Sequence, residues 1–259
     1  KADQIYRVIQ TKDSAEEGEQ KFSAVSLNVA IAAREEIPSV ENSVRFLQFG
    51  RYVIRNPETQ RAFYEPFLTA ENSVFKVFDF KLLAGDPETA LKEPNTIVIT
   101  TELSKKLFGD EDAMGKTIAT DRGMDLLVTG IIEDLPVNSH LQFESLVSHM
   151  TLEIQPWWDE NTNLDWGSQN WITYLSLQPN ADAEQVGRQL TAFAETRAQE
   201  TRPFEGSLAL QPLKDIHFGS AGFSRGLNSN PSTHIYLRIF GLIGLFILGI
   251  ACINYINLA

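Results

Sequence analysis

The sequence predicts an α+β fold: a split βαβ, ferredoxin-like sheet, interrupted by an inserted, mostly-β block and followed by a transmembrane helix. A strand–helix–strand pattern opens the polar part of the chain and a second one closes it, which is the arrangement of a split βαβ sheet. Short strands around one short helix lie between the two patterns. The final 21 residues, Ile239–Ala259, contain no charged side chain, and about 20 apolar residues span the hydrocarbon core of a bilayer.

The opening pattern begins at Ile5–Gln10, where apolar and polar residues alternate as in a strand. Ser26 is a suitable N-cap for a helix that ends at Glu36, because Leu27, Ala30 and Ile31 then fall on one face. The remaining elements expected before the inserted block are strands at Val44–Phe49, Tyr52–Arg55 and Arg61–Leu68, and a short helix at Ser73–Phe80.

The middle block contains one expected helix, capped by Thr101, running through Phe108 and stopped by Gly109. Its expected strands are Ile97–Thr100, Thr117–Ala119, Leu126–Ile132 and Phe143–Val147. The closing pattern is a strand at Trp171–Leu177, a helix at Ala183–Gln199 that starts with the capping pair Asp182 and Gln185, and a strand at Leu208–Leu213. The predicted division is a discontinuous subdomain of 1–93 and 149–234, an inserted subdomain of 94–148, and the start of a transmembrane helix at 235–259.

The composition excludes several classes of function. The 259 residues carry a net charge of −12, so we expect no nucleic-acid partner, because phosphates repel such a surface. The only cysteine is Cys252, inside the apolar tail, which excludes an internal disulfide and a cysteine zinc site.

The apolar tail has the features of a packed membrane helix. Its small residues Gly241, Gly244 and Gly249 permit close helix packing, and Asn254 and Asn257 are expected to face another helix rather than lipid. The chain starts without an initiator Met and stops inside the apolar segment. We therefore expect an excised stretch of a longer polypeptide, held between a membrane helix upstream of Lys1 and one that starts near Ile235.

The segment Gly109–Thr117 (GDEDAMGKT) is similar to a phosphate-binding loop, but three features speak against nucleotide binding. Five residues separate its glycines, whereas a P-loop has four. Its three consecutive carboxylates, starting at Asp110, would repel the phosphate. It also follows a helix instead of a strand. We expect a capped turn in which Lys116 has no catalytic role.

No other motif indicates catalysis. His140, His149, His217 and His234 have no metal-ligand spacing, Gly219–Gly222 is one residue short of a nucleophile elbow, and no pair of carboxylates can be singled out. We therefore assign no catalytic, cofactor-binding or metal-ligating residue. The tryptophans Trp157, Trp158, Trp166 and Trp171 leave two interpretations open: a ligand platform or an aromatic core with a loop lid.

Three stretches resemble the MacB-like periplasmic core domains of FtsX-like ABC transporter permeases. They are Asp86–Leu91 (DPETAL), Pro94–Thr117 (PNTIVITTELSKKLFGDEDAMGKT) and Val128–His140 (VTGIIEDLPVNSH). The tail FILGIACINYINLA is similar to the start of the family's second membrane helix. The resemblance implies a porter subdomain with an inserted Sabre subdomain, four membrane helices per permease, a permease dimer and a cytoplasmic ABC ATPase. It admits a periplasmic adaptor protein as a further partner.

The resemblance also implies a function. Such a domain would lie in the periplasm, residues 1–234 outside the bacterial inner membrane, and couple ATP hydrolysis to export or release of a substrate. It offers no catalytic residues and no cofactor. The alternative is a membrane-anchored extracytoplasmic binding or sensor domain, motivated by the tryptophans. A tethered enzyme comes last, because fold alone does not exclude an unfamiliar site.

Overall fold

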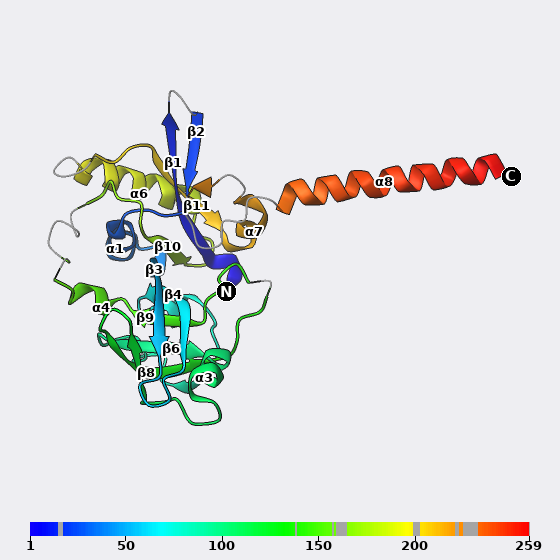
Figure 1. Cartoon of the computed structure of the whole chain (residues 1–259). Helices are drawn as coiled ribbons and strands as arrows, with labels where there is room; N and C mark the ends of the chain where they lie inside the picture. Colours follow the sequence, from blue (N-terminus) through cyan, green and yellow to red (C-terminus); the bar gives the residue numbers. More distant parts are fainter. Residues whose placement is uncertain are drawn as a thin grey trace.

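A computed structural model describes residues 1–14, 18–137, 139–156, 158, 165–198, 203–220, 223–224 and 233–258. The described strands form one mixed, twelve-stranded sheet, and helices cover parts of it (Figure 1). The strands are β1 (Ile5–Ser14), β2 (Gly18–Phe22), β3 (Val40–Arg55), β4 (Ala62–Ala70), β5 (Leu82–Gly85), β6 (Thr96–Thr100), β7 (Thr117–Thr120), β8 (Asp125–Ile132), β9 (Ser145–Ser148), β10 (Ile172–Leu177), β11 (Ser207–Pro212) and β12 (Phe223–Ser224). The helices are η1 (Ala2–Gln4), α1 (Leu27–Glu36), α2 (Val74–Val77), α3 (Thr101–Phe108), α4 (Met150–Glu153), α6 (Ala183–Arg197), η3 (Leu213–Asp215), α7 (Ile216–Gly219) and α8 (Thr233–Leu258).

Four strands, in the order β11-β1-β10-β3, form a ferredoxin-like sheet in which every neighbouring pair is antiparallel. In chain order these are the fourth, first, third and second strands of two βαβ units, so the predicted α+β, split βαβ fold is confirmed. Helices α1 and α6 pack on one face through an apolar cluster that includes Val29, Leu175 and Leu190. The opposite face carries a second cluster with Phe46, Phe78 and Tyr174.

The N-caps of α1 and α6 are the residues that the sequence predicted, whereas the N-cap of α3 differs. The Ser26 hydroxyl accepts from Asn28 N at the start of α1, and the Asp182 carboxylate accepts from two backbone N–H groups at the start of α6. In α3 the cap is Thr100 and not Thr101: the Thr100 hydroxyl accepts from Leu103 N at 3.2 Å. Thr100 is the cap because it is still extended at the end of β6, which is the backbone conformation that an N-cap requires.

The two strands expected at Val44–Phe49 and Tyr52–Arg55 are one strand, β3. A register shift between Gln48 and Arg51 interrupts its pairing with β4, and Gly50 there has a φ of 79°. Glycine adopts this conformation readily, so it permits a bulge where the sequence indicated a break. The helix expected over Ser73–Phe80 is also shorter and covers only α2.

The β3–β4 hairpin connects the ferredoxin-like sheet to a distal half of the molecule, made of β9, β6, β8, β5, β7 and α3 (Figure 1). Its apolar cluster contains Leu103 and Leu107 of α3 together with Tyr52, Ile54 and Phe67 of the hairpin. β5, which precedes residue 94, pairs with β8 of the same half. The boundary of the inserted subdomain at 94–148 stays a prediction.

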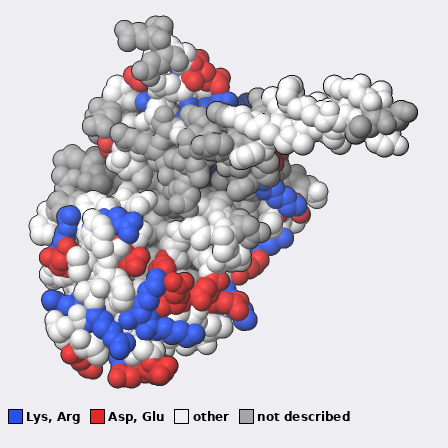
Figure 2. All heavy atoms as spheres, turned by 45° about the vertical axis from the view of Figure 1, so that its right-hand side comes forward, with Lys and Arg blue, Asp and Glu red and all other residues white. Residues whose placement is uncertain are grey.

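Helix α8 extends away from the rest of the molecule (Figure 1). Its segment Ile239–Asn257 has a mean hydropathy of 2.3 and none of it is buried, so by length and composition it is a candidate membrane span. Figure 2 shows no acidic or basic side chain along the segment Ile239–Asn257 of this helix, in contrast to the rest of the surface. The 19 residues at 1.5 Å each suffice to cross a hydrocarbon core.

Candidate functional site

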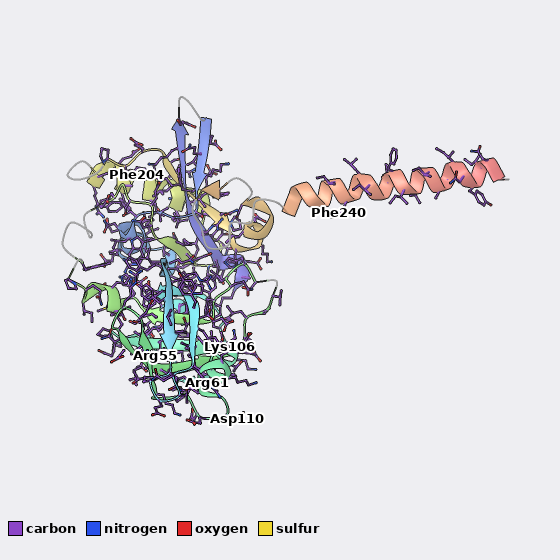
Figure 3. All side chains as sticks on the ribbon, viewed as in Figure 1. Arg55, Arg61, Lys106, Asp110, Phe204 and Phe240 are labelled. Atoms are coloured by element: carbon purple, nitrogen blue, oxygen red, sulfur yellow. The ribbon has the colours of Figure 1, made fainter. Side chains whose placement is uncertain are left out.

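The segment similar to a phosphate-binding loop is a turn between α3 and β7. Lys116 N donates to Ala113 O at 3.1 Å, and the Lys116 ammonium forms an ion pair with Glu111. The lysine is therefore held by a carboxylate of its own loop and does not face an open phosphate site. Asp110 of this loop lies at the end of the domain far from the start of α8 (Figure 3).

The histidines do not form one site. His140 contacts the ferredoxin-like sheet, whereas His149 is buried beside Trp171. The side chains of His217 and His234 lie outside the described residues. Among the residues that the structure describes, no group of three His, Cys, Asp or Glu side chains is placed to hold a metal ion.

The described tryptophans take part in packing. Trp171 and Trp166 are 3% and 8% exposed. The rings of Trp158 and His149 meet Trp171 edge to face, with centroids 6.1 and 5.0 Å away. Trp157 lies outside the described residues. A buried aromatic face cannot serve as an open ligand platform, so Trp166 and Trp171 favour the aromatic-core interpretation.

A buried ion pair lies next to this aromatic cluster. Arg45 Nη2 donates to Glu71 Oε1 at 2.5 Å, Arg45 N donates to Glu71 Oε2 at 3.0 Å, and the guanidinium lies 5.8 Å from the centroid of Trp171. Burial alone would raise the pKa of the Glu71 carboxyl, but the charge and hydrogen bond of Arg45 outweigh burial and lower that pKa. The pair fixes the centre of β3 to the end of β4.

An acidic cleft of about 320 Å³ lies on the distal half. Lys106 of α3 (labelled in Figure 3) compensates two of its carboxylates, with 3.0 Å contacts to Glu102 and Glu144. Burial, together with the charge of Glu144, raises the pKa of Glu65. Acidic and basic side chains accordingly gather side by side on this half (Figure 2). The cleft contains compensated charges and no nucleophile–base pair that we can assign.

A larger groove of about 720 Å³ lies between α6 and strand β11. Within the described sheet, β11 pairs only with β1, so its other edge is open to strand addition. Thr191 of α6 covers part of this edge, because its hydroxyl accepts from Leu208 N at 2.8 Å. Pro212 ends the strand, and proline has no N–H to donate. Both features oppose strand addition at this groove.

The most unusual arrangement lies where the chain leaves the sheet toward α8. We call the residues Arg7, Tyr174, Gln211 and Ser220 the junction. Arg7 Nη2 donates to Gln211 Oε1 at 2.6 Å and to Ser220 Oγ at 2.7 Å. The guanidinium lies 5.3 Å from the ring centroid of Phe223. Arg7 is 3% exposed, so a buried cation connects β1 to the segment that precedes α8.

The junction extends to His140 through Tyr174. Tyr174 Oη lies 3.0 Å from His140 Nε2. Burial raises the pKa of Tyr174 to about 12 against the opposing effect of Arg7, and the phenol therefore keeps its proton. Burial and the nearby charge of Arg7 lower the pKa of His140 to about 4. A neutral imidazole next to a protonated phenol fits donation from Tyr174 Oη to His140 Nε2.

Further contacts hold the beginning of the described domain beside the segment that leads to α8. Asp3 of η1 forms an ion pair with Lys214 of η3. Lys1 Nζ lies 2.7 Å from Asp79 Oδ1, which belongs to the segment after α2. Strand β12 pairs in parallel with β2, with Phe223 opposite Lys21. Residues 221–222 and 225–232, in the Gly- and Ser-rich stretch between α7 and α8, lie outside the described residues.

Sequence reasoning did not identify the junction. One signal was present, because Arg7 is the only charged residue of the strand predicted at Ile5–Gln10. Its partners come from β10, β11 and the segment after α7, more than 160 residues away along the chain. Only the sheet order brings them together.

The split βαβ sheet and the apolar helix α8 define the class of this protein: an α+β domain with a candidate membrane helix at its end. A family model for the MacB-like periplasmic core domain matches residues 1–193. The match covers about three quarters of the chain, and the chain belongs to this family, the periplasmic domain of MacB- and FtsX-like ABC transporter permeases.

Solved structures agree with this assignment. A domain of a putative permease protein from Porphyromonas gingivalis is 26% identical, with a TM-score of 0.69 over 92% of this chain and 97% of that chain. Two structures at 11% identity share the fold: the periplasmic region of MacB from Actinobacillus actinomycetemcomitans (TM-score 0.58, 85% of this chain and 94% of that chain) and the extracellular domain of the noncanonic ABC-type transporter YknZ from Gram-positive bacteria (0.57, 80% and 99%). No curated protein matches the chain by sequence.

Proposed function

We propose that this domain couples ATP hydrolysis by a cytoplasmic ABC ATPase to export or release of a substrate outside the bacterial inner membrane. Family membership implies an ABC transporter with an ATPase partner and a dimer. The domain would act as a lever in the periplasm, driven through the membrane helix that includes α8, and a periplasmic adaptor would be a further partner.

One structural observation carries the proposal. The start of the domain and the segment that leads to α8 are bound to each other by the Asp3–Lys214 ion pair and by Arg7 with Ser220. Both segments also belong to the same sheet, because β1 pairs with β11 over Tyr6–Thr11. A displacement of α8 would therefore move the sheet as a body instead of only the linker.

The alternative, a membrane-anchored binding or sensor domain, has less support from the described residues. It was motivated by the tryptophans, of which Trp166 and Trp171 are buried. A lever and a sensor predict different responses to ATP, because only a lever moves in step with the nucleotide state.

The test uses the full-length permease with its ATPase in lipid nanodiscs. A spin label replaces Val137, which is 98% exposed in the loop after β8, in a Cys252→Ser background. The distance between the two labels of the dimer is measured with ATP and with ADP. A flexible Gly/Ser insertion after Ser229 should abolish the ATP-dependent change in distance, whereas ATP turnover continues. The domain should remain folded, since each doubling of loop length costs only about 0.6 kcal/mol.

The matched control is the same insertion after Thr59, in the exposed turn between β3 and β4. This control should retain the ATP-dependent change in distance. A change that persists after the Ser229 insertion, or a distance that never depends on nucleotide, would disprove the lever.

A further inference from the structure

We infer that Ser220, Arg7, Tyr174 and His140 form a polar chain, buried at its centre and half-buried at its ends, that couples the segment before α8 to the loop that follows β8. The two ends of this chain contact different parts of the molecule. Ser220 follows α7 on the way to α8, and His140 precedes Leu141 and Phe143, which pack into the cluster shared with the distal half. The role of this coupling in transport rests on the proposed function, whereas the contacts between the four residues can be tested without it.

The Ser220 end is fixed by a set of short contacts. The Ser220 hydroxyl accepts from Arg7 at 2.7 Å and donates to Ile216 O at 2.5 Å. Gln211 Nε2 also approaches it, at 3.5 Å. The position of Ser220 is thus set by strands β1 and β11 and not only by its own helical turn. A movement of α8 that pulls on this segment must break or shift these contacts.

The middle of the chain is a buried charge with neutral partners. Among the described residues, no carboxylate forms an ion pair with Arg7, and its Nε–H has no hydrogen-bond partner. Burial lowers the pKa of the guanidinium, yet it stays charged. A buried charge depends on the hydrogen bonds it makes, so the loss of one partner strongly disfavours the arrangement. This favours two discrete arrangements over a gradual loosening.

The far end connects the sheet to the loop. Tyr174 is 1% exposed and packs edge to face against Phe78 at 5.1 Å, so the position of its hydroxyl is fixed. The charge of Arg7 acts on that hydroxyl, and His140 Nε2 lies 3.0 Å from it. A shift of Arg7 therefore changes the hydrogen bond between Tyr174 and His140. The loop after β8 is then displaced although it does not contact the segment before α8.

The test measures hydrogen–deuterium exchange in the full-length permease in nanodiscs, with peptides that cover residues 213–220 and 139–143. Ser220→Ala removes one oxygen at the linker end, and Tyr174→Phe removes one oxygen in the middle. We expect Ser220→Ala to accelerate exchange in 139–143, and Tyr174→Phe to accelerate exchange in 213–220, each by about tenfold. The effect thus appears at the end that the variant does not contact.

Two variants serve as matched controls. Ser73→Ala removes a hydroxyl that donates to Ser43 O at 2.7 Å, and Tyr52→Phe alters a buried tyrosine of the distal cluster. Neither residue belongs to the polar chain, so neither should change exchange at both ends. Arg7→Met should accelerate exchange at both, and its melting temperature and circular dichroism show whether the fold is retained.

The inference is overturned if Ser220→Ala changes only 213–220 and Tyr174→Phe changes only 139–143, or if neither peptide changes. This readout requires neither ATPase nor substrate. A negative result here together with an intact ATP-dependent label distance would reject the polar chain and leave the lever in place.

Discussion

The hydroxyl of Tyr174 lies 3.0 Å from Nε2 of His140, and Tyr174 separates this imidazole from the buried guanidinium of Arg7. The contact joins strand β10 to the loop after β8, although 34 residues separate the two side chains along the chain. It also places a titratable group in surroundings that strongly disfavour its charged form, which makes the stability of the domain depend on pH.

We expect the protein to lose stability on acidification through His140. Burial and Arg7 lower its pKa from 6.5 to about 4, so between these values the unfolded state binds a proton that the folded state excludes. The free energy of unfolding is therefore highest above about pH 6.5. It falls by a total of about 3 kcal/mol as the pH is lowered toward 4. Urea unfolding at several pH values measures it. His140→Gln should flatten the curve in this window, and an unchanged slope would contradict the assignment.

The buried Arg45–Glu71 pair should contribute more to the free energy of unfolding than exposed ion pairs do. Arg45→Met leaves a buried carboxylate without its cation, and we expect a loss of about 3–5 kcal/mol in the free energy of unfolding. The exposed pair of Lys81 and Glu133, at 3.2 Å, provides the control: Lys81→Met should cost less than about 1 kcal/mol. Equal losses in chemical denaturation would show that burial does not distinguish the two pairs.

Gly85 should not tolerate a side chain. Its φ is 98°, and an added Cβ would collide with the backbone oxygen of Thr129 on β8. Gly123 has a φ of 77° but no atom within 4 Å of an added Cβ, so Gly123→Ala should cost only the backbone strain of about 1–2 kcal/mol. We expect Gly85→Ala to cost more, because β5 must separate from β8. Thermal unfolding of both variants compares them, and equal costs would contradict the close approach.

Lys116→Ala should leave ATP turnover of the whole transporter unchanged. The residue lies in a turn of the periplasmic domain, and its ammonium already pairs with Glu111. The substitution therefore removes no phosphate-binding group. An ATPase assay of the variant and a nucleotide-binding assay of the full chain check this expectation. Tight ATP binding that depends on Lys116 would refute it.

Much of the fold follows from local patterns in the sequence. Ser26 and Asp182 cap helices as predicted because capping is a contact within three residues of the chain. The ferredoxin-like order was accessible because two strand–helix–strand patterns admit few un-knotted arrangements. The bulge at Gly50 was not, because a glycine between two apolar runs is read equally well as a turn or as an irregularity within one strand.

The sequence by itself determined the α+β class, the apolar segment and the exclusion of a P-loop at Gly109–Thr117, because each depends on period, composition or spacing. Only the tertiary structure decided that Trp171 is buried in a core and that Arg7 meets Ser220 and Tyr174. Burial and long-range contacts depend on which strands are neighbours, and the pairing of β1 with β10 and β11 joins segments at opposite ends of the chain. Free energy gained over the whole sheet selects that pairing, so no local pattern records it.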